Sequence, residues 1–205
     1  MAHWYQDFFG SDYLLRYPED PANTATEVAN IVALLELEPP GRILDLACGY
    51  GRHALLLAER GFDVVGLDLS GDLLAEARYR ASQRGLTIDF VQGDMRRLPF
   101  QAEFDALINV FTSFGYFEDA ENAQVLEEAA KCLRPQGRFL IEMINRDGIL
   151  RNFQPRMWQG LPRRFPPHRN QLRSAHFPHR WTHCLYLASG TGPRVPALHT
   201  SVLGA

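Results

Sequence analysis

The stretch RILDLACGYGRHALLLAERG, residues 42–61, constrains the fold more than any other part of the sequence. Its first residues, RILDLA, form the short apolar run that is typical of a buried strand. Two glycines one residue apart follow, and they favour a tight turn because glycine adopts backbone conformations that other residues avoid. GRHALLLAERG then has helical spacing and ends at Gly61, a residue type common just after a helix. A strand, a glycine turn and a helix in this order predict a βαβ unit with a ligand site at the turn.

The alternation of strand and helix continues along the chain. Apolar runs predict further strands at residues 62–70, 86–94, 103–111 and 137–145. Helical spacing predicts further helices at residues 24–41, 71–85 and 118–137. The first of these helices stops at Pro39, the second is capped by Ser70 and ended by Gly85, and the third leaves through a Pro-Gly turn. We predict an α/β fold, a Rossmann-like doubly wound and mostly parallel sheet with helices on both faces.

Length and composition match an ordinary globular protein. The 205 residues favour one domain, and 46% apolar and 22% charged residues are usual for a soluble protein. Three scattered cysteines argue against a disulfide framework and fit a reducing cytosol. The N-terminus lacks a signal-peptide pattern, and no apolar run approaches the ~20 residues that span a bilayer. These features predict a cytoplasmic protein without a membrane partner.

The glycine turn by itself fits more than one ligand. GYGRHA matches G-x-G-x-x-[G/A], the dinucleotide fingerprint, and Asp68 follows at a suitable distance for a ribose-binding acid. A strand-to-helix turn in any α/β protein also favours glycine. An NAD-type oxidoreductase and a purely structural turn therefore both remain open from this motif.

Three features favour a different ligand. Asp45 ends the first strand, where its charge would repel the phosphates of a dinucleotide and would suit a cationic group such as an α-ammonium. With Asp68 and Asp94, acids end three successive strands and line one crevice of an open parallel sheet. After the fourth strand, INVFTSFGYF offers aromatic side chains to an adenine or a thioether. The crevice therefore predicts a cationic, hydroxyl-rich ligand with an adenine amine.

Five segments together, ILDLACGYG, VVGLDLS, VQGDMRRLPF, FDALINVFTSFGYF and LRPQGRFLIEMIN, resemble the class I S-adenosylmethionine-dependent methyltransferases. The resemblance covers about residues 22–145, and the ordered set is far more specific than any one segment. Ala47 replaces the first glycine of the family's D/E-x-G-x-G-x-G loop, a change that we expect to restrict the backbone only slightly. The resemblance implies S-adenosyl-L-methionine as cofactor and a seven-stranded sheet whose last two strands form an antiparallel hairpin.

The resemblance also implies roles for the residues that match the family motifs. The loop around the methionine part of the cofactor would comprise Asp45, Ala47, Cys48, Gly49 and Gly51. Asp68 would accept hydrogen bonds from both ribose hydroxyls, because a carboxylate offers only acceptors. Leu69 would pack on the adenine face. The alternative for Asp68 is an acid that stabilises a helix N-terminus.

The third and fourth strand ends carry the remaining expected cofactor contacts. Asp94 would accept a hydrogen bond from the adenine amine, between Gly93 and Met95, which would also contact the adenine. Asn109 and Phe111 would lie beneath the sulfonium. The alternative for Asp94 is a residue that only forms a turn.

The N-terminal segment HWYQDFFGSDYLLRYPED is unusually aromatic. It predicts either an amphipathic helix packed on the sheet or a lid over the cofactor, as N-terminal helices often form in such methyltransferases. We favour a lid, with Tyr5, Tyr13 and Arg16 as candidate contacts to the cofactor carboxylate or the substrate. His53 is a candidate general base, but we expect it to be a first-turn residue beside the cofactor.

The composition changes sharply after Asp147. All 24 acidic residues lie at or before this position, whereas residues 148–205 hold eight arginines and no acid. The histidines and the cysteine of HFPHRWTHC have a spacing that could suggest zinc, but Pro178 prevents a regular helix and no second cluster completes a site, so we predict no metal site. The arginines lack the lysines and the periodicity of a nucleic-acid patch, so we predict no nucleic-acid partner.

We therefore predict three parts: a lid at residues 1–21, a cofactor-binding core at residues 22–150 and an atypical basic tail at residues 151–205. Family-like sequence fades after RNFQPRMWQ, and only WTHCLYLA has strand-like alternation. A basic arm and a chain translated out of frame from about Gly160 both explain this composition, and we favour the second. It implies a tail without fixed structure and a sheet with atypical or incomplete C-terminal strands. The nucleotide sequence around the codon for Gly160 tests this hypothesis.

The function that we predict is methyl transfer from S-adenosyl-L-methionine to a small-molecule acceptor. Such a transfer needs a nucleophile held in line with the sulfonium methyl group, and proximity and orientation supply much of its rate. No residue can be assigned as the general base from the sequence. Two alternatives are an NAD(P)-dependent oxidoreductase on the same topology and a cofactor-binding protein that is non-catalytic or inactivated.

Overall fold

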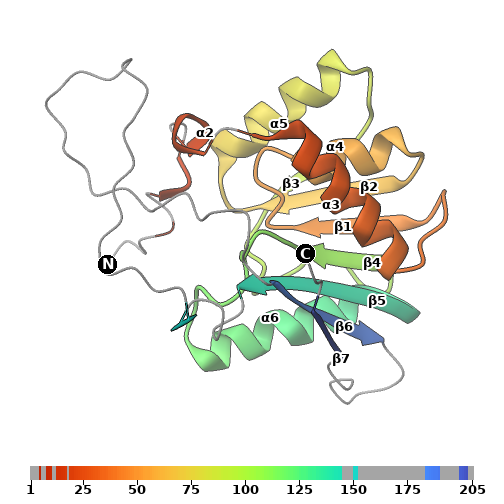
Figure 1. The fold of residues 1–205 in the computed structure, drawn as a ribbon, viewed down its shortest axis with the longest axis vertical. Coiled ribbons are helices and arrows are strands. Elements are labelled where there is room, and N and C mark those ends of the chain that lie inside the picture. The colour runs from red at the N-terminus through yellow and green to blue at the C-terminus, as the bar shows by residue number, and fades with distance from the viewer. Residues whose placement is uncertain are drawn as a thin grey trace, which may run out of the picture.

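Seven strands form one sheet in the order β3-β2-β1-β4-β5-β6-β7 (Figure 1). The computed structural model describes the backbone of residues 5, 8–10, 13–17, 19–144, 150–151, 183–189 and 199–202. The strands are β1 (Arg42–Leu46), β2 (Asp63–Asp68), β3 (Asp89–Gln92), β4 (Phe104–Asn109), β5 (Leu133–Ile144), β6 (His183–Ser189) and β7 (His199–Val202). The helices are α2 (Tyr13–Arg16), α3 (Pro21–Leu34), α4 (Arg52–Glu59), α5 (Gly71–Gln83) and α6 (Asp119–Cys132).

The first five strands run parallel, as the alternation of strands and helices predicts. Ile43 of β1, for example, lies opposite Val64 of β2 on one side and Ala106 of β4 on the other. Chain order and spatial order differ because β1 lies at the centre of the five parallel strands, and the chain builds first one side of the sheet from it and then the other. The predicted Rossmann-like, mostly parallel sheet is confirmed.

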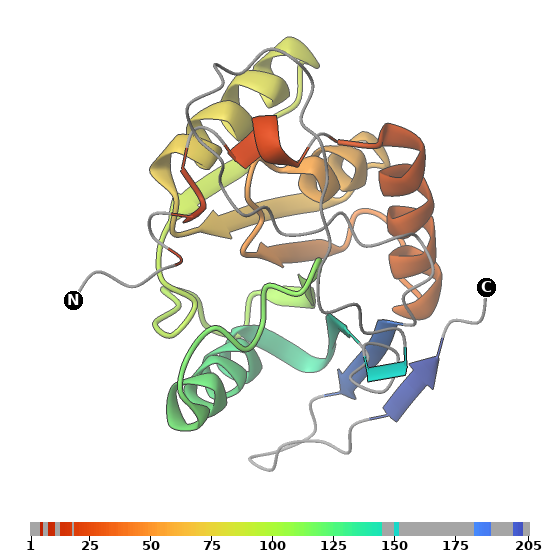
Figure 2. The ribbon, with the colours of Figure 1, turned by 60° about the vertical axis from the view of Figure 1, so that its left-hand side comes forward.

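Helices cover both faces of the sheet (Figure 2). On one face, Val28 of α3, Ala54 of α4 and Leu74 of α5 pack with Ile43 and other strand residues in one fully buried cluster. On the other face, residues of α6 pack with alternate residues of the same strands, among them Leu44. Successive side chains of a strand point to opposite faces, so strands covered on both faces are mainly apolar.

Local signals fix where the helices begin. The Asp20 side chain accepts hydrogen bonds from the backbone N–H groups of Ala22 and Asn23, and Pro21 occupies the first turn of α3. The predicted cap of α5 is confirmed, because the Ser70 hydroxyl accepts from the N–H of Leu73 at 3.3 Å. These contacts satisfy backbone donors that the helix itself leaves unpaired.

The prediction that the last helix continues to a Pro-Gly exit is wrong. Helix α6 ends at Cys132, and Leu133 already pairs with Phe104 of β4. Pro135 disfavours helical backbone at the residue before it. The pairing register then shifts before Arg138 pairs with Ala106, and Gln136 takes a left-handed conformation within the shift.

Two further strands form the C-terminal edge of the sheet. Strand β6 pairs antiparallel with β5 over seven residue pairs, and β7 pairs antiparallel with β6. The strand suggested by WTHCLYLA is therefore present as β6, and an antiparallel last pair agrees with the resemblance. Residues 152–182, 190–198 and 203–205 lie outside the described part, so the proposed change of frame stays a prediction.

The parallel order brings the ends of β1, β2, β3 and β4 to one edge of the sheet. The connections reverse direction between β1 and β4, which is where open α/β sheets bind their ligands. None of the described helices is long and apolar enough to cross a membrane.

Candidate functional site

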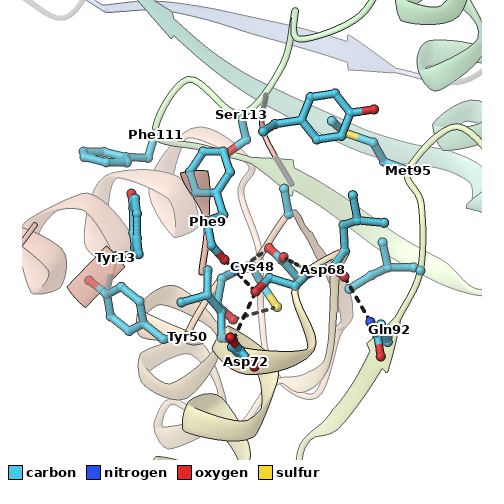
Figure 3. Close-up of a pocket in the computed structure, with 18 of the residues that line it drawn as sticks. Phe9, Tyr13, Cys48, Tyr50, Asp68, Asp72, Gln92, Met95, Phe111 and Ser113 are labelled. Atoms are coloured by element: carbon cyan, nitrogen blue, oxygen red, sulfur yellow. Dashed lines mark hydrogen bonds between the residues drawn. The ribbon is translucent and has the colours of Figure 1, made fainter. Parts of the chain in front are cut away.

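A cavity of about 480 Å³ lies at this edge of the sheet (Figure 3). Tyr13, Tyr50 and Phe111 stand along one side of it, and Gln92 and Met95 stand along the other (Figure 3). The candidate residues that line the cavity are Tyr5, Tyr13, Ala47, Cys48, Gly49, Asp68, Leu69, Gly93, Asp94, Met95 and Phe111. Segments from five parts of the sequence therefore meet where the strand-end argument predicts a site.

The glycine turn takes a left-handed backbone at three alternate positions, with φ of 62° at Ala47, 56° at Gly49 and 77° at Gly51. Glycine reaches this conformation without strain, whereas an L side chain there costs on the order of 1–2 kcal/mol. The substitution at Ala47 is therefore less neutral than the sequence suggests. Gly51 is outside the cavity wall, and a Cβ added there would lie 3.1 Å from the Phe90 ring and 3.2 Å from Cβ of Ala77. Its small size lets the start of α4 lie close against α5 and β3.

Asp68, at the end of β2, joins the glycine turn to α5. One carboxylate oxygen accepts from the N–H of Gly49 at 2.7 Å, and the other accepts from the N–H of Ser70 at 2.8 Å. Burial raises the pKa of Asp68, against the opposing effect of these backbone donors. A carboxylate has about four acceptor positions, so each oxygen keeps one for a ligand.

Asp94, after β3, is held by Arg96. The Arg96 guanidinium and its backbone N–H both donate to the carboxylate, at distances from 2.6 to 3.1 Å. Partial burial favours the neutral acid, but the hydrogen bonds and charge of Arg96 outweigh it and lower the pKa of Asp94. The bond from the Arg96 N–H to Asp94 forms the turn that the alternative explanation of Asp94 expects. The Asp94 side chain also lines the cavity.

Leu69 and Met95 complete the wall on this side. The Leu69 side chain is 38% exposed, unusual for leucine, and its backbone carbonyl accepts from the Gln92 side chain at 3.1 Å. Met95 is buried within the second core cluster. An exposed apolar side chain inside a cavity offers a flat surface to a ligand ring.

Asp45 and Asn109 do not line the cavity. Asp45 is 1% exposed, and neither of its carboxylate oxygens has a hydrogen bond of normal geometry to any residue that the structure describes. Burial raises the pKa of Asp45 to about 6, against the opposing effects of His53, Arg52 and the N–H of Ala54. Asn109 is fully buried, and its amide donates to the carbonyl of Leu46 at 2.8 Å, which ties β4 to β1. Their cofactor roles stay predictions.

A charged cluster lies at the start of α4, beside the turn. Glu27 of α3 accepts from Arg52 at 2.5 Å and lies 2.9 Å from Nε2 of His53. Burial favours protonation of Glu27, but His53 and Arg52 outweigh it and lower the pKa of this carboxyl. Nη2 of Arg52 is buried without a hydrogen-bond partner among the described residues. Both Arg52 and His53 line the cavity, so the position of His53 agrees with the expectation of a first-turn residue beside the site.

Phe111, just after β4, stands over this cluster. Its ring is half exposed, and the Arg52 guanidinium lies 4.9 Å from the ring centroid. The N–H of Phe111 donates to Glu142 at 2.8 Å. Phe111 and Thr112 both have left-handed φ angles, of 59° and 58°, so the chain is strained where it passes the cavity.

Aromatic residues of the N-terminal segment close another part of the wall. Tyr5 and Tyr13 are both buried and line the cavity. Phe9 stacks on Tyr116 with 5.8 Å between the ring centroids and lies 5.2 Å from the ring of Tyr13. Burial raises the pKa of Tyr116 to about 12, with a further contribution from Asp68. The Arg16 side chain lies outside the described part.

Sequence reasoning missed several residues of the site. The residues that were not named individually are Phe9, Glu27, Tyr50, Arg52, Gln92, Tyr116 and Phe117. Most of them lie in segments that the sequence did single out, namely the N-terminal aromatic segment, the glycine loop and INVFTSFGYF. Glu27 had no such signal. No three potential metal ligands group together within the described residues. His176 and His179 are outside that part, as are the side chains of His183 and Cys184.

Comparisons with known proteins agree with this geometry. Residues 43–137 match the family model described as a methyltransferase domain. A demethylmenaquinone methyltransferase of Thermus thermophilus is 39% identical over 65% of this chain and 55% of its own length. A glycine/sarcosine N-methyltransferase of Halorhodospira halochloris is 38% identical over 53% of this chain and 42% of its own length.

A solved structure gives the same result for the fold. The crystal structure of protein PH0226 from Pyrococcus horikoshii superposes with a TM-score of 0.60 and 31% identity, over 69% of this chain and 65% of that one. The chain spans about half the length of the curated relatives that it matches. The matched segment contains the glycine turn, Asp68 and Asp94, which form the cavity described above. Residues 43–137 thus form a methyltransferase domain, similar to those of the class I S-adenosylmethionine-dependent methyltransferases.

Proposed function

We propose that the chain binds S-adenosyl-L-methionine in this cavity and transfers its methyl group to a small-molecule acceptor by in-line displacement. The observation that carries the proposal is Asp68, a buried carboxylate that stands in the cavity between the glycine turn and the exposed Leu69. Its two backbone hydrogen bonds leave one acceptor position on each oxygen. Two such positions fit the two hydroxyls of a ribose.

The residues around Asp68 fit the rest of the cofactor. Leu69 and Met95 offer apolar surface to an adenine, and Asp94 offers an acceptor to its amine. At the other end, Nη2 of Arg52 has no partner among the described residues, which suits the α-carboxylate, and the charge of Asp45 favours a cation nearby. When bound, S-adenosyl-L-methionine supplies an electrophilic methyl group on a sulfonium whose leaving group is a neutral thioether.

The protein's contribution to the transfer is position and exclusion of water. Phe111, Tyr13 and Tyr116 form an aromatic wall next to the expected methyl position, and such a wall can hold an acceptor against the cofactor. Both curated relatives are named for small-molecule substrates, which supports a small-molecule acceptor.

Calorimetry with S-adenosylhomocysteine, S-adenosyl-L-methionine and NAD⁺ tests the cofactor. We expect the two S-adenosyl compounds to bind one per chain and NAD⁺ to give no heat of binding. Preferential binding of NAD⁺ would support the oxidoreductase alternative. A second measurement follows formation of S-adenosylhomocysteine with panels of small amines, phenols and quinols as acceptors. Tight binding without turnover on any panel would favour the non-catalytic alternative.

A further inference from the structure

We propose that Arg96 is a positioning residue that orients the Asp94 carboxylate to read the amine of the adenine. The inference rests on the proposed function, because it concerns an S-adenosyl compound in the same cavity. Asp94 lines that cavity, whereas Arg96 is outside its wall and contacts Asp94 from behind it.

The contact between the two residues is a fork. Nη2 of Arg96 donates to one carboxylate oxygen of Asp94 at 2.6 Å, and Nε donates to the other oxygen at 3.1 Å. The backbone N–H of Arg96 donates to that second oxygen at 2.9 Å. Planar two-point contacts of this kind fix the orientation of a carboxylate as well as its charge.

The hydrogen-bond count leaves one place for a ligand. A carboxylate has about four acceptor positions, and three N–H groups of Arg96 donate to them. The single hydrogen of Nε is shared between both oxygens at 3.1 Å each, so it fills about one position, and one position is left for a ligand. An adenine amine can donate one hydrogen bond there. The carbonyl oxygen of a hypoxanthine cannot, because it and the carboxylate oxygen are both acceptors.

Arg96 is itself fixed from three directions. Its Nη1 donates to Glu121 of α6 at 2.5 Å, and its guanidinium lies 4.3 Å from the ring centroid of Phe117. Gln124 of α6 donates to the Arg96 carbonyl at 2.9 Å. Phe117 lines the cavity and meets the Tyr5 ring edge-on at 5.5 Å. The orientation of Asp94 is therefore tied to α6 and to the aromatic wall.

A simpler explanation is a turn that only closes the chain after β3. That turn needs the bond from the Arg96 N–H to Asp94 and no more. The guanidinium contacts to Asp94, and the contacts that hold Arg96 to Glu121, Phe117 and Gln124, are more than such a turn requires. A turn also predicts no preference between nucleobases, so base selectivity separates the two explanations.

The experiment measures the dissociation constants of S-adenosylhomocysteine and S-inosylhomocysteine, in which a carbonyl oxygen replaces the adenine amine. We expect the unmodified chain to prefer the adenine compound by roughly tenfold or more, the scale of a hydrogen bond to a charged group. Arg96→Gln should reduce this ratio to within about threefold, and Arg96→Lys, which keeps the charge without the fork, should be intermediate. In an Asp94→Asn background, Arg96→Gln should cause no further change in the ratio.

Arg84→Gln is the matched control. Arg84 forms a comparable pair with Glu59, at 3.1 Å and away from the cavity, so its loss should leave the ratio unchanged. An unchanged ratio in folded Arg96→Gln would overturn the inference. If that variant does not fold, Arg96→Lys and Glu121→Gln take its place, and an unchanged ratio in both overturns it. A parent chain that binds neither compound contradicts the proposed function, whereas equal binding of both contradicts only this inference.

Discussion

The hydroxyl of Ser70 donates a hydrogen bond to the backbone carbonyl of Phe9, with 2.7 Å between the two oxygens. The same hydroxyl caps α5 through Leu73, and the Ser70 N–H bonds to Asp68. The N-terminal aromatic segment is thus joined directly to Ser70, which lies two residues after the proposed ribose-binding acid and is hydrogen-bonded to it. Binding at Asp68 and the position of the segment should therefore depend on each other.

This contact leads to a prediction about the lid. Hydrogen exchange of backbone amides before Ala22 should slow when S-adenosylhomocysteine is added, because a bound ligand fills the cavity that Tyr5 and Tyr13 line. Ser70→Ala should weaken this protection and destabilise the chain by about 1 kcal/mol through loss of the cap. Ser82→Ala is the control, since that hydroxyl donates to the carbonyl of Tyr79 near the other end of α5, away from the N-terminal segment. Equal exchange with and without ligand would show that the segment only packs on the sheet and does not act as a lid.

The ribose assignment predicts a loss of affinity in Asp68→Ala. Removing a charged acceptor should weaken S-adenosylhomocysteine binding by about 1.5–3 kcal/mol, as measured by calorimetry. Asp63→Ala is the control, because Asp63 begins the same strand at the far edge of the sheet and its side chain is 60% exposed. Circular dichroism should show that both variants fold. Parental affinity in folded Asp68→Ala would refute the assignment.

Gly66, inside β2, should tolerate no side chain. A Cβ there would lie 2.7 Å from the Phe90 ring and 2.9 Å from the sulfur of Cys48. Gly66→Ala should therefore lower the free energy of unfolding by about 1–3 kcal/mol in a denaturant titration, because the packed core cannot yield without strain. Gly71→Ala should be neutral or slightly stabilising, since a Cβ at the start of α5 meets only the flexible Gln92 side chain at 3.4 Å. Equal stability of the two variants would contradict this account of the core.

Asp45 should make stability depend on pH. Its folded pKa of about 6 lies above the ordinary value of 3.8, so the folded chain holds the proton more tightly than the unfolded chain. This contribution is full below about pH 4 and is lost as the pH rises through 6. Asp45→Asn, which cannot ionise, should therefore gain up to about 3 kcal/mol relative to the parent between pH 4 and pH 7. Denaturant titrations at both pH values measure the change, and a constant difference between the two chains would show that Asp45 titrates normally.

Much of the fold could be predicted because its signals are local. A buried strand, a glycine turn and an apolar helical stripe each depend on neighbouring residues, so the order of β1 to β5 and the cap at Ser70 agree with the sequence. The end of α6 was misplaced because it depends on a non-local pairing, that of Leu133 with Phe104. Strand β7 had no clear signal in the sequence for the same reason, since its residues pair with β6.

The candidate site could also be predicted only in part. Parallel strands end at one edge of a sheet, so the sequence alone predicted that Asp68, Asp94 and the glycine turn share one crevice, and the structure has them there. It also predicted Asp45 and Asn109 in the cofactor site, whereas neither side chain reaches the cavity wall. Whether a side chain at a strand end faces the ligand or the core depends on the helices packed around it.

The sequence determined the order of the elements, the parallel sheet and the set of acids at the strand ends, because backbone preference and hydrophobic period act over a few residues. Only the tertiary structure decided the partners of the charged groups. Glu27 meets His53 because α3 packs beside α4, and Arg96 meets Glu121 because α6 returns beside the turn after β3. Such contacts join residues about 25 positions apart on different helices and turns. No local pattern encodes them, since they arise from the packing of whole elements against one sheet.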